Sequence, residues 1–298
     1  MTDVHERLEA PEAELAALDE GRAFADRSTY RKLRVDGPDA GTWLNDLLTA
    51  GLAGLREGHA RRSLLLGPTG RIRADVVVVG AAEGFVVLQD PLQPTALGDL
   101  LSPYVLSSAV TLADVTDDLA LYSIPGAAGD ALPWPGSRPS VLGEGRDLLV
   151  PAADASRIEA MLVDARLVRA GDDALEVWRI RRGVARFPTD LTGESVPAEA
   201  GLDDLIDATK GCFLGQESVA KIRNLGHPAK LIRAARTDAE VGPGAEVLAD
   251  RVRVGRVTSA AQAAGGGTAC LVHIGWVARD AWLTTADGSP LVSPGPST

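Results

Sequence analysis

The residues best suited to chemistry lie together at positions 210–217, in the order Lys-Gly-Cys-Phe-Leu-Gly-Gln-Glu. This signature segment combines a cation, a thiol and a carboxylate with Gly211 and Gly215, which allow backbone conformations that other residues avoid. Lys210 and the N-terminus of a helical run at 218–225 would both favour the thiolate form of Cys212. The segment is therefore a candidate site for a reactive or ligand-facing thiol. Physical arguments alone favour a buried cysteine in a glycine-shaped turn, because no histidine adjoins it as a base.

A second candidate is the arginine-rich segment, residues 178–188, which contains four arginines and no acidic residue. Guanidinium groups bind carboxylate or phosphate through paired N–H donors. The segment therefore predicts either an anion site or a solvated helix face whose arginines pair with carboxylates of this acidic chain. Both interpretations are open at this point.

Asp75 stands in an apolar run that follows the turn sequence Gly-Pro-Thr-Gly at 67–70. A lone carboxylate entering a buried strand costs several kcal/mol unless it is paired or hydrogen-bonded. We therefore expect Asp75 either to bind a ligand with a tuned pKa, or to lie on the exposed side of an edge strand or accept from a nearby arginine. The glycines here do not have the order of a P-loop.

Composition excludes several classes of protein. The 298 residues carry 30 basic and 41 acidic side chains, a net charge of −11, which argues against a general nucleic-acid binder. Two separated cysteines and four histidines show no metal-ligand spacing, so a zinc or cysteine-held iron–sulfur site within one chain is not expected. No signal peptide or membrane span is evident, and we expect a soluble cytoplasmic protein.

Hydrophobic patterns predict the elements that position these residues. Strands are expected at 32–35, 62–66, 72–79, 85–88 and 110–115. Helices are expected at 40–48, capped by Asp39, and at 94–106 and 153–165, while residues 8–18 fit either a short amphipathic helix or a frayed arm. Residues 174–181 fit either type. Beyond residue 231, valine-rich runs with frequent glycine indicate a small all-β domain, and a Pro/Gly-rich loop lies near 131–147. Mixed strands, hairpins and helices indicate an α+β fold.

The signature segment is similar in every fixed position to the K-G-C-F/Y-x-G-Q-E signature of YgfZ-type proteins, relatives of the glycine-cleavage T-protein (aminomethyltransferase). Residues 32–40, 64–72 and 197–202 resemble the opening strand and turn, the following hairpin and the approach to the signature. The resemblance covers roughly residues 22–236. It implies an N-terminal arm at 1–21, a folate-binding region of two subdomains around a central cavity at 22–230, and a C-terminal β-barrel with a disordered tail at 231–298.

The resemblance also implies a function. It suggests a folate-pocket accessory protein that supports assembly or repair of iron–sulfur proteins, including enzymes that modify tRNA. Tetrahydrofolate or a derivative would be the cofactor, and iron–sulfur client enzymes the partners, with no direct contact to nucleic acid or membrane. Two alternatives are open. One is an aminomethyltransferase of glycine cleavage, a tetrahydrofolate-dependent one-carbon transferase, and the other is a binding or scaffold protein with a vestigial pocket.

The residues carried over from the resemblance fall into two groups. Cys212 and Asp75 would be catalytic, and the ligand would be bound by Asp75, Trp178, Arg181, Lys210, Gly211, Phe213, Gly215, Gln216, Glu217 and Arg223.

One position departs from the family pattern. Arg181 stands where the R-L/I-E-x-G pattern has a glutamate that holds the pterin ring. A guanidinium has only donors, whereas the pterin's amino group and ring N–H need an acceptor. The pocket would then hold folate differently, bind another anionic ligand or have lost folate. The basic stretches 179–186 and 210–236, with net charges of +4 and +5, suit an anion such as a folate's glutamate tail.

Overall fold

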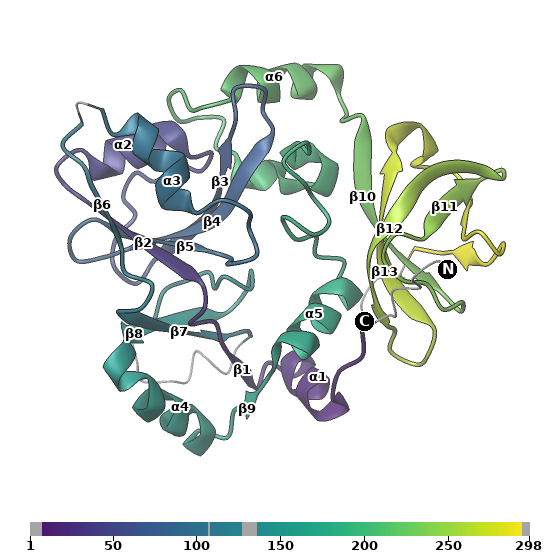
Figure 1. The fold of residues 1–298 in the computed structure, drawn as a ribbon, viewed down its shortest axis with the longest axis horizontal. Helices are drawn as coiled ribbons and strands as arrows, with labels where there is room; N and C mark the ends of the chain where they lie inside the picture. The colour runs from purple at the N-terminus through teal and green to yellow at the C-terminus, as the bar shows by residue number, and fades with distance from the viewer. Residues whose placement is uncertain (1–7, 107, 127–135, 294–298) are drawn as a thin grey trace. The chain divides into compact units, whose positions relative to one another are not determined.

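The computed structural model describes residues 8–106, 108–126 and 136–293. By its contacts the chain divides into two compact units, whose elements are labelled in Figure 1. The first contains Met1–Leu15, Asp172–Leu202 and Val219–Thr298, and the second contains Ala16–Gly171 and Asp203–Ser218. Two helices, α1 (Glu12–Asp19) and α6 (Gln216–Leu225), begin in one unit and end in the other. Among the described helices, none has the length and apolar content that a bilayer crossing requires.

The second unit is built on two β-sheets. The larger is antiparallel, in the order β3 (Ala60–Leu66), β4 (Ile72–Gly80), β5 (Phe85–Gln89), β2 (Arg31–Asp36) and β6 (Thr111–Asp114). The smaller has the order β8 (Arg146–Pro151), β7 (Leu119–Ile124), β1 (Ala23–Asp26) and β9 (Val168–Arg169), and its β1–β9 pair is parallel.

The two sheets and their helices form four layers. Helices α2 (Ala40–Leu47) and α3 (Leu97–Leu101) cover one face of the larger sheet, where Val76 and Val78 meet Leu44 and Leu97. The other face packs on the smaller sheet, and α4 (Ala155–Asp164) covers the far side of that sheet (Figure 1). Because both faces of β4 are buried, its sequence is a continuous valine run instead of an alternating pattern.

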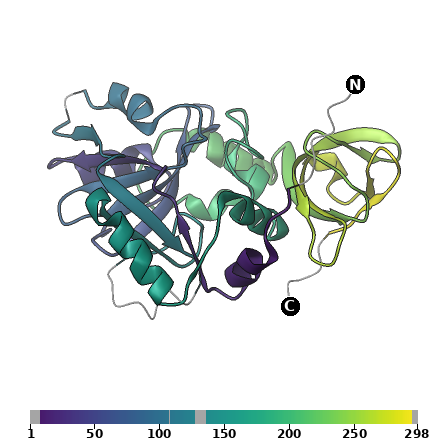
Figure 2. The same ribbon diagram turned by 60° about the horizontal axis from the view of Figure 1, so that its bottom comes forward.

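The first unit contains a barrel of six strands. Their order is β10 (Lys230–Thr237), β13 (Thr268–Gly275), β12 (Val252–Gln262), β11 (Glu246–Ala249), β14 (Leu283–Thr284) and β15 (Pro290–Leu291). Backbone hydrogen bonds between Arg236 and Val292 bring the two ends of the sheet together, and Figure 2 shows the strands curving round. Helix α5 (Asp172–Arg181) packs on β12 and β13. Short 3₁₀ turns lie at Ser102–Tyr104, Ala152–Asp154, Pro197–Ala200, Leu202–Leu205 and Trp276–Ala278.

The predicted α+β class and C-terminal barrel are confirmed, and residues 174–181 are helical. The helix predicted at 94–106 was too long. The Gln89 side chain bonds the Thr95 carbonyl and the Leu97 amide, so the helix begins only at Leu97, and the chain then passes into a 3₁₀ turn containing Pro103. Residues 1–7, 131–135 and 294–298 of the predicted arm, loop and tail lie outside the described residues.

Asp39 occupies the N-cap position of α2 as predicted, but its side chain makes no capping bond. Its carboxylate instead accepts a hydrogen bond from the Ala109 amide at 2.7 Å. The Asp39 carboxylate therefore holds the loop at Ala109, which is distant in sequence, instead of capping the helix.

Candidate functional site

Lys210 ties the signature segment to the end of α2, within the second unit. Its ammonium donates to the carbonyl oxygens of Asn45, Leu48 and Ala50, the last at 3.1 Å. These carbonyls lie where the helix ends and its backbone acceptors lack intrahelical partners. Burial lowers the Lys210 pKa to about 8, and the ammonium lies 5.2 Å from the centre of the Phe213 ring. Lys210 therefore closes a helix end, a task different from the thiolate stabilisation suggested by its place in the sequence.

Gly215 packs the other end of the segment against the hairpin turn, residues 67–70. Its φ is +84°, and a Cβ at this position would lie 2.6 Å from the Gly67 carbonyl oxygen. The Ser218 hydroxyl adds a bond to the Pro68 carbonyl at 3.1 Å. Gly211 is different, because a Cβ there would meet nothing within 4 Å. The fold thus brings the signature segment and the hairpin turn together, and Gly215 makes their close approach possible.

Cys212 is exposed, between these two anchors. The second cysteine, Cys270, is fully buried in the barrel core, and burial raises its pKa to about 12. A thiol must ionise to act as a nucleophile or ligand, so Cys270 is not a candidate for either role. The described residues contain no cluster of three histidine, cysteine or carboxylate side chains able to hold a metal.

The other residues of the signature segment are divided between core and surface. The Phe213 side chain is buried, and Leu214 packs on the core beneath α2. Gln216 and Glu217 begin helix α6, where Gln216 is half-buried and Glu217 is exposed. Arg223 is exposed in the last turn of the same helix.

Asp75 is held by Arg62 from the neighbouring strand. Arg62 Nε donates to Oδ1 at 3.0 Å and Nη2 to Oδ2 at 2.6 Å, and this carboxylate raises the arginine's pKa. The Gln93 side chain bonds both the amide and the carbonyl of Asp75, which keeps the strand position fixed. Of the alternatives for Asp75, the structure shows acceptance from a nearby arginine.

Arg62 was missed in the sequence analysis. In the β3–β4 register Leu64 lies opposite Asp75, so Arg62 and Asp75 are diagonal neighbours on one face. Pairing the two predicted strands across the hairpin turn would have revealed this contact.

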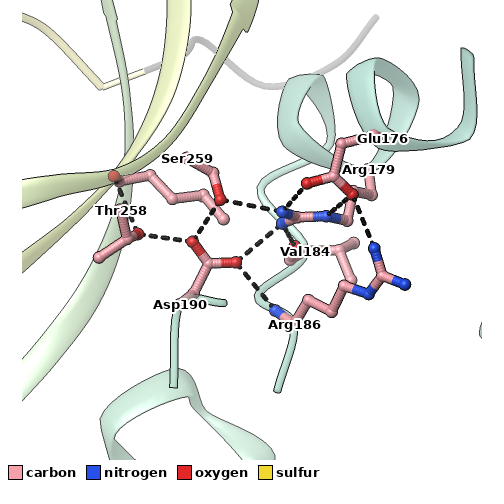
Figure 3. A network of polar contacts seen from close by, with 8 residues as sticks. Glu176, Arg179, Val184, Arg186, Asp190, Thr258 and Ser259 are labelled. Atoms are coloured by element: carbon pink, nitrogen blue, oxygen red, sulfur yellow. Dashed lines mark hydrogen bonds and ion pairs between the residues drawn. The ribbon is translucent and has the colours of Figure 1, made fainter. Parts of the chain in front are cut away.

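In the first unit, two of the four arginines of the arginine-rich segment, Arg179 and Arg186, form internal ion pairs (Figure 3). Arg179 binds Glu176 through Nε, at 2.6 Å, and through Nη2. Its Nη1 reaches Asp190 at 2.8 Å, and Arg186 Nη1 donates to Glu176 at 3.2 Å. For Arg179 and Arg186 the structure therefore supports pairing with the chain's own carboxylates.

Asp190 is the centre of this network. Its side chain is fully buried and also accepts from Thr258 Oγ1 at 2.5 Å, Ser259 Oγ at 2.7 Å and the Arg186 amide at 3.0 Å. The network thereby joins α5, the loop that follows it and β12. Nothing local in the sequence marked Asp190, because its partners on β12 lie 68 and 69 residues away.

Trp178 and Arg181 lie on α5 and are two of the three predicted ligand-binding residues of this unit, the third being Arg223. Trp178 is buried, its Nε1 has no hydrogen-bond partner among the described residues, and the Arg182 guanidinium lies 4.5 Å from its ring centre. Arg181 Nε donates to the Gln262 carbonyl at 2.8 Å. The predicted residues are therefore divided between the two units, with Asp75 and the signature segment in the second.

Comparison with known proteins identifies related sequences. Residues 5–132 match the model of the GCVT N-terminal domain. The chain is 25% identical over 284 residues to a proposed chloroplastic transferase of Arabidopsis thaliana, covering 86% of this chain and 66% of the relative. It is also 25% identical over 247 residues to an aminomethyltransferase of Rubrobacter xylanophilus, covering 74% and 66%. The chain thus spans just under two thirds of the length of these two curated relatives.

A solved structure extends the comparison to the fold. The glycine cleavage system aminomethyltransferase T from Bartonella henselae superposes with a TM-score of 0.81 at 20% identity, covering 97% of this chain and 90% of that chain. The chain therefore combines a match to the GCVT N-terminal domain with the aminomethyltransferase fold over nearly its whole length.

Proposed function

We propose that this protein is a folate-binding accessory protein that supports the assembly or repair of iron–sulfur proteins in the cytoplasm, and through them tRNA modification. The exposed thiol of Cys212 carries the proposal, because it lies on a segment anchored by Lys210 at one end and Gly215 at the other. A cysteine with only a structural role does not need an exposed thiol on an anchored segment. Similarity of the signature segment to the YgfZ signature and the aminomethyltransferase fold support the same function.

The predicted ligand-binding residues fit the glutamate tail of a folate better than they fit its pterin ring. Arg181 offers donors that suit the carboxylates of a folate's glutamate tail. The buried Trp178 Nε1 lacks a partner among the described residues, and a ligand carbonyl or ring nitrogen would satisfy it. The donor edge of a pterin needs an acceptor, which Arg181 lacks, and Arg62 already occupies one acceptor position on each oxygen of the Asp75 carboxylate. The proposal therefore assigns folate binding to the protein and no transfer chemistry at the ring.

Cys212 would act where a client protein meets the chain. A single thiol can hold a cluster only together with ligands from elsewhere, so the client would supply the remaining ligands. Both cysteines are unpaired, as expected in a reducing compartment. The net charge of −11 gives no support for a nucleic-acid partner, so the effect on tRNA would be indirect.

Isothermal titration calorimetry of the full chain with folinic acid tests the ligand. Saturable heat is the expected result. Absence of heat at high ligand concentration would refute the folate part and leave a scaffold protein with a vestigial pocket. An aminomethyl-transfer assay with tetrahydrofolate tests the alternative function, and turnover there would overturn the accessory role.

Complementation of a deletion strain tests the thiol. Cys212→Ala is expected to fold normally and to fail in supporting iron–sulfur enzymes, whereas the matched variant Cys270→Ala removes a buried thiol and should retain support. Circular dichroism confirms folding of both variants. Full complementation by Cys212→Ala would show that its thiol is dispensable.

A further inference from the structure

A small pocket in the first unit belongs to neither the signature segment nor the Asp190 network. It has a volume of about 120 Å³ and lies where the end of α5 meets β10 and the β12–β13 hairpin. Its walls consist of five alanines and Ile180, together with two arginines, Arg181 and Arg236. Alanines leave the space open, and the arginines provide its only charged side chains.

Both guanidinium groups are fixed by the hairpin and retain free donors. Arg181 Nε donates to the Gln262 carbonyl at 2.8 Å, and Arg236 Nη2 donates to the Gly266 carbonyl at 3.0 Å. Each bond uses one of the five N–H donors of its guanidinium. Within the described part of the chain, neither arginine forms an ion pair with a carboxylate. Arg179, on the same helix as Arg181, has its charge neutralised by Glu176 and Asp190.

The placement of the two arginines follows from regular structure. On β10, Ala234 and Arg236 are two positions apart and therefore share a face. Ala269 lies opposite Arg236 on β13, so a small side chain stands beside the guanidinium. Arg181 is the last residue of α5 and reaches the same pocket from the helix.

We propose that this pocket binds a small oxyanion, the carboxylate or phosphate group of a small-molecule ligand. Two guanidiniums held by carbonyl bonds present planar pairs of donors, which match either group. In a chain with a net charge of −11, two cations without carboxylate partners form a local site instead of a general basic field. The pocket shares Arg181 with the proposed folate site, but the inference rests on the geometry of the pocket and not on folate binding.

Titration of the full chain with inorganic phosphate, and separately with glutarate, tests the site. Ionic strength is kept constant with sodium chloride so that general screening does not change. Nuclear magnetic resonance should show saturable shifts of the arginine Nε–H signals and of residues 263–269. Arg181→Gln and Arg236→Gln should each weaken binding by about tenfold or more. Arg253→Gln, which removes an exposed arginine paired with Glu246, is the matched control and should bind normally.

A second variant separates the pocket from surface charge. Ala269→Leu keeps both arginines and fills the space between them, so it should abolish saturable binding. Tighter binding of glutarate would identify a carboxylate ligand, and tighter binding of phosphate a phosphate ligand. Shifts that never saturate, or an equal loss in Arg253→Gln, would overturn the proposal. The phosphate and glutarate titrations do not use folinic acid, so a protein that fails to bind folate can still confirm or refute the oxyanion site.

Discussion

The two glycines of the signature segment should respond differently to the same substitution. Gly215 has a φ of +84°, and an added Cβ would lie 2.6 Å from the Gly67 carbonyl oxygen, a backbone atom that cannot rotate away. Gly211 has open space at its Cβ position. We therefore expect Gly215→Ala to separate the signature segment from the hairpin turn and Gly211→Ala to leave both in place.

The magnitude follows from two contributions. A side chain in the left-handed region costs about 1–2 kcal/mol. Relief of the contact requires the segment to move away from the turn, which breaks the Ser218–Pro68 bond and costs about 1 kcal/mol more. The sum of about 2–3 kcal/mol corresponds to a local opening equilibrium about 30 to 150 times larger. Gly211→Ala should be neutral or stabilise by up to about 1 kcal/mol, because alanine restricts the unfolded chain.

Hydrogen exchange followed by mass spectrometry measures this opening directly. Peptides covering residues 64–72 and 205–218 should exchange faster in Gly215→Ala and at the wild-type rate in Gly211→Ala. Peptides of the barrel serve as an internal control and should be unchanged in both variants. Equal exchange of the two variants in the signature segment would refute the assigned contact.

Two further predictions concern buried carboxylates. Asp190→Ala should lower the free energy of unfolding by about 3–5 kcal/mol, since it leaves buried donors without their acceptor. The control Asp154→Ala removes an exposed ion pair and should lower the free energy of unfolding by about 0–1 kcal/mol. Urea titrations that give similar values for the two variants would contradict a stabilising role of the Asp190 network. Burial raises the pKa of Asp147 to about 6, although Ser123, Ser140 and the Val141 amide donate to its carboxylate. Because the folded state binds this proton more tightly, the stability it contributes is present below about pH 4 and is lost as the pH rises through about 6, a change of about 3 kcal/mol. Asp147→Asn should therefore flatten the urea midpoint between pH 4.5 and 7, and an unchanged pH profile would show that Asp147 does not titrate in this range.

Much of the fold could be predicted from local pattern. The strands around the hairpin turn were predicted because turn residues separate two apolar runs, and the C-terminal all-β domain because short valine-rich runs alternate with glycine. That this domain is a barrel was implied by the family resemblance. The length of α3 could not be predicted, because the Gln89 side chain at the end of β5 holds residues 95–97, and nothing in the local pattern shows where that side chain points. The Asp39 side chain likewise bonds a residue 70 positions away.

The candidate site was only partly predictable. Its cysteine and glycines stand in one short motif, so residue types and spacing were enough to mark the motif as a candidate. The roles within the motif were not apparent, because Gly211 and Gly215 are equivalent in the sequence and differ only in what lies next to them. Lys210, too, reaches carbonyls more than 150 residues earlier in the chain.

The sequence by itself determined the α+β class, an all-β C-terminal domain and the position of the signature segment, because these depend on periodicity and on residues close together in the chain. Tertiary structure alone decided which charges are neutralised. Arg179 and Arg181 stand two residues apart on one helix, yet the first meets Glu176 and Asp190 while the second faces a pocket beside Arg236. Glu176 is one helical turn from Arg179, but only the fold places Asp190 beside Arg179, and Gln262 and Arg236 beside Arg181. The free energy of a buried charge depends on such partners.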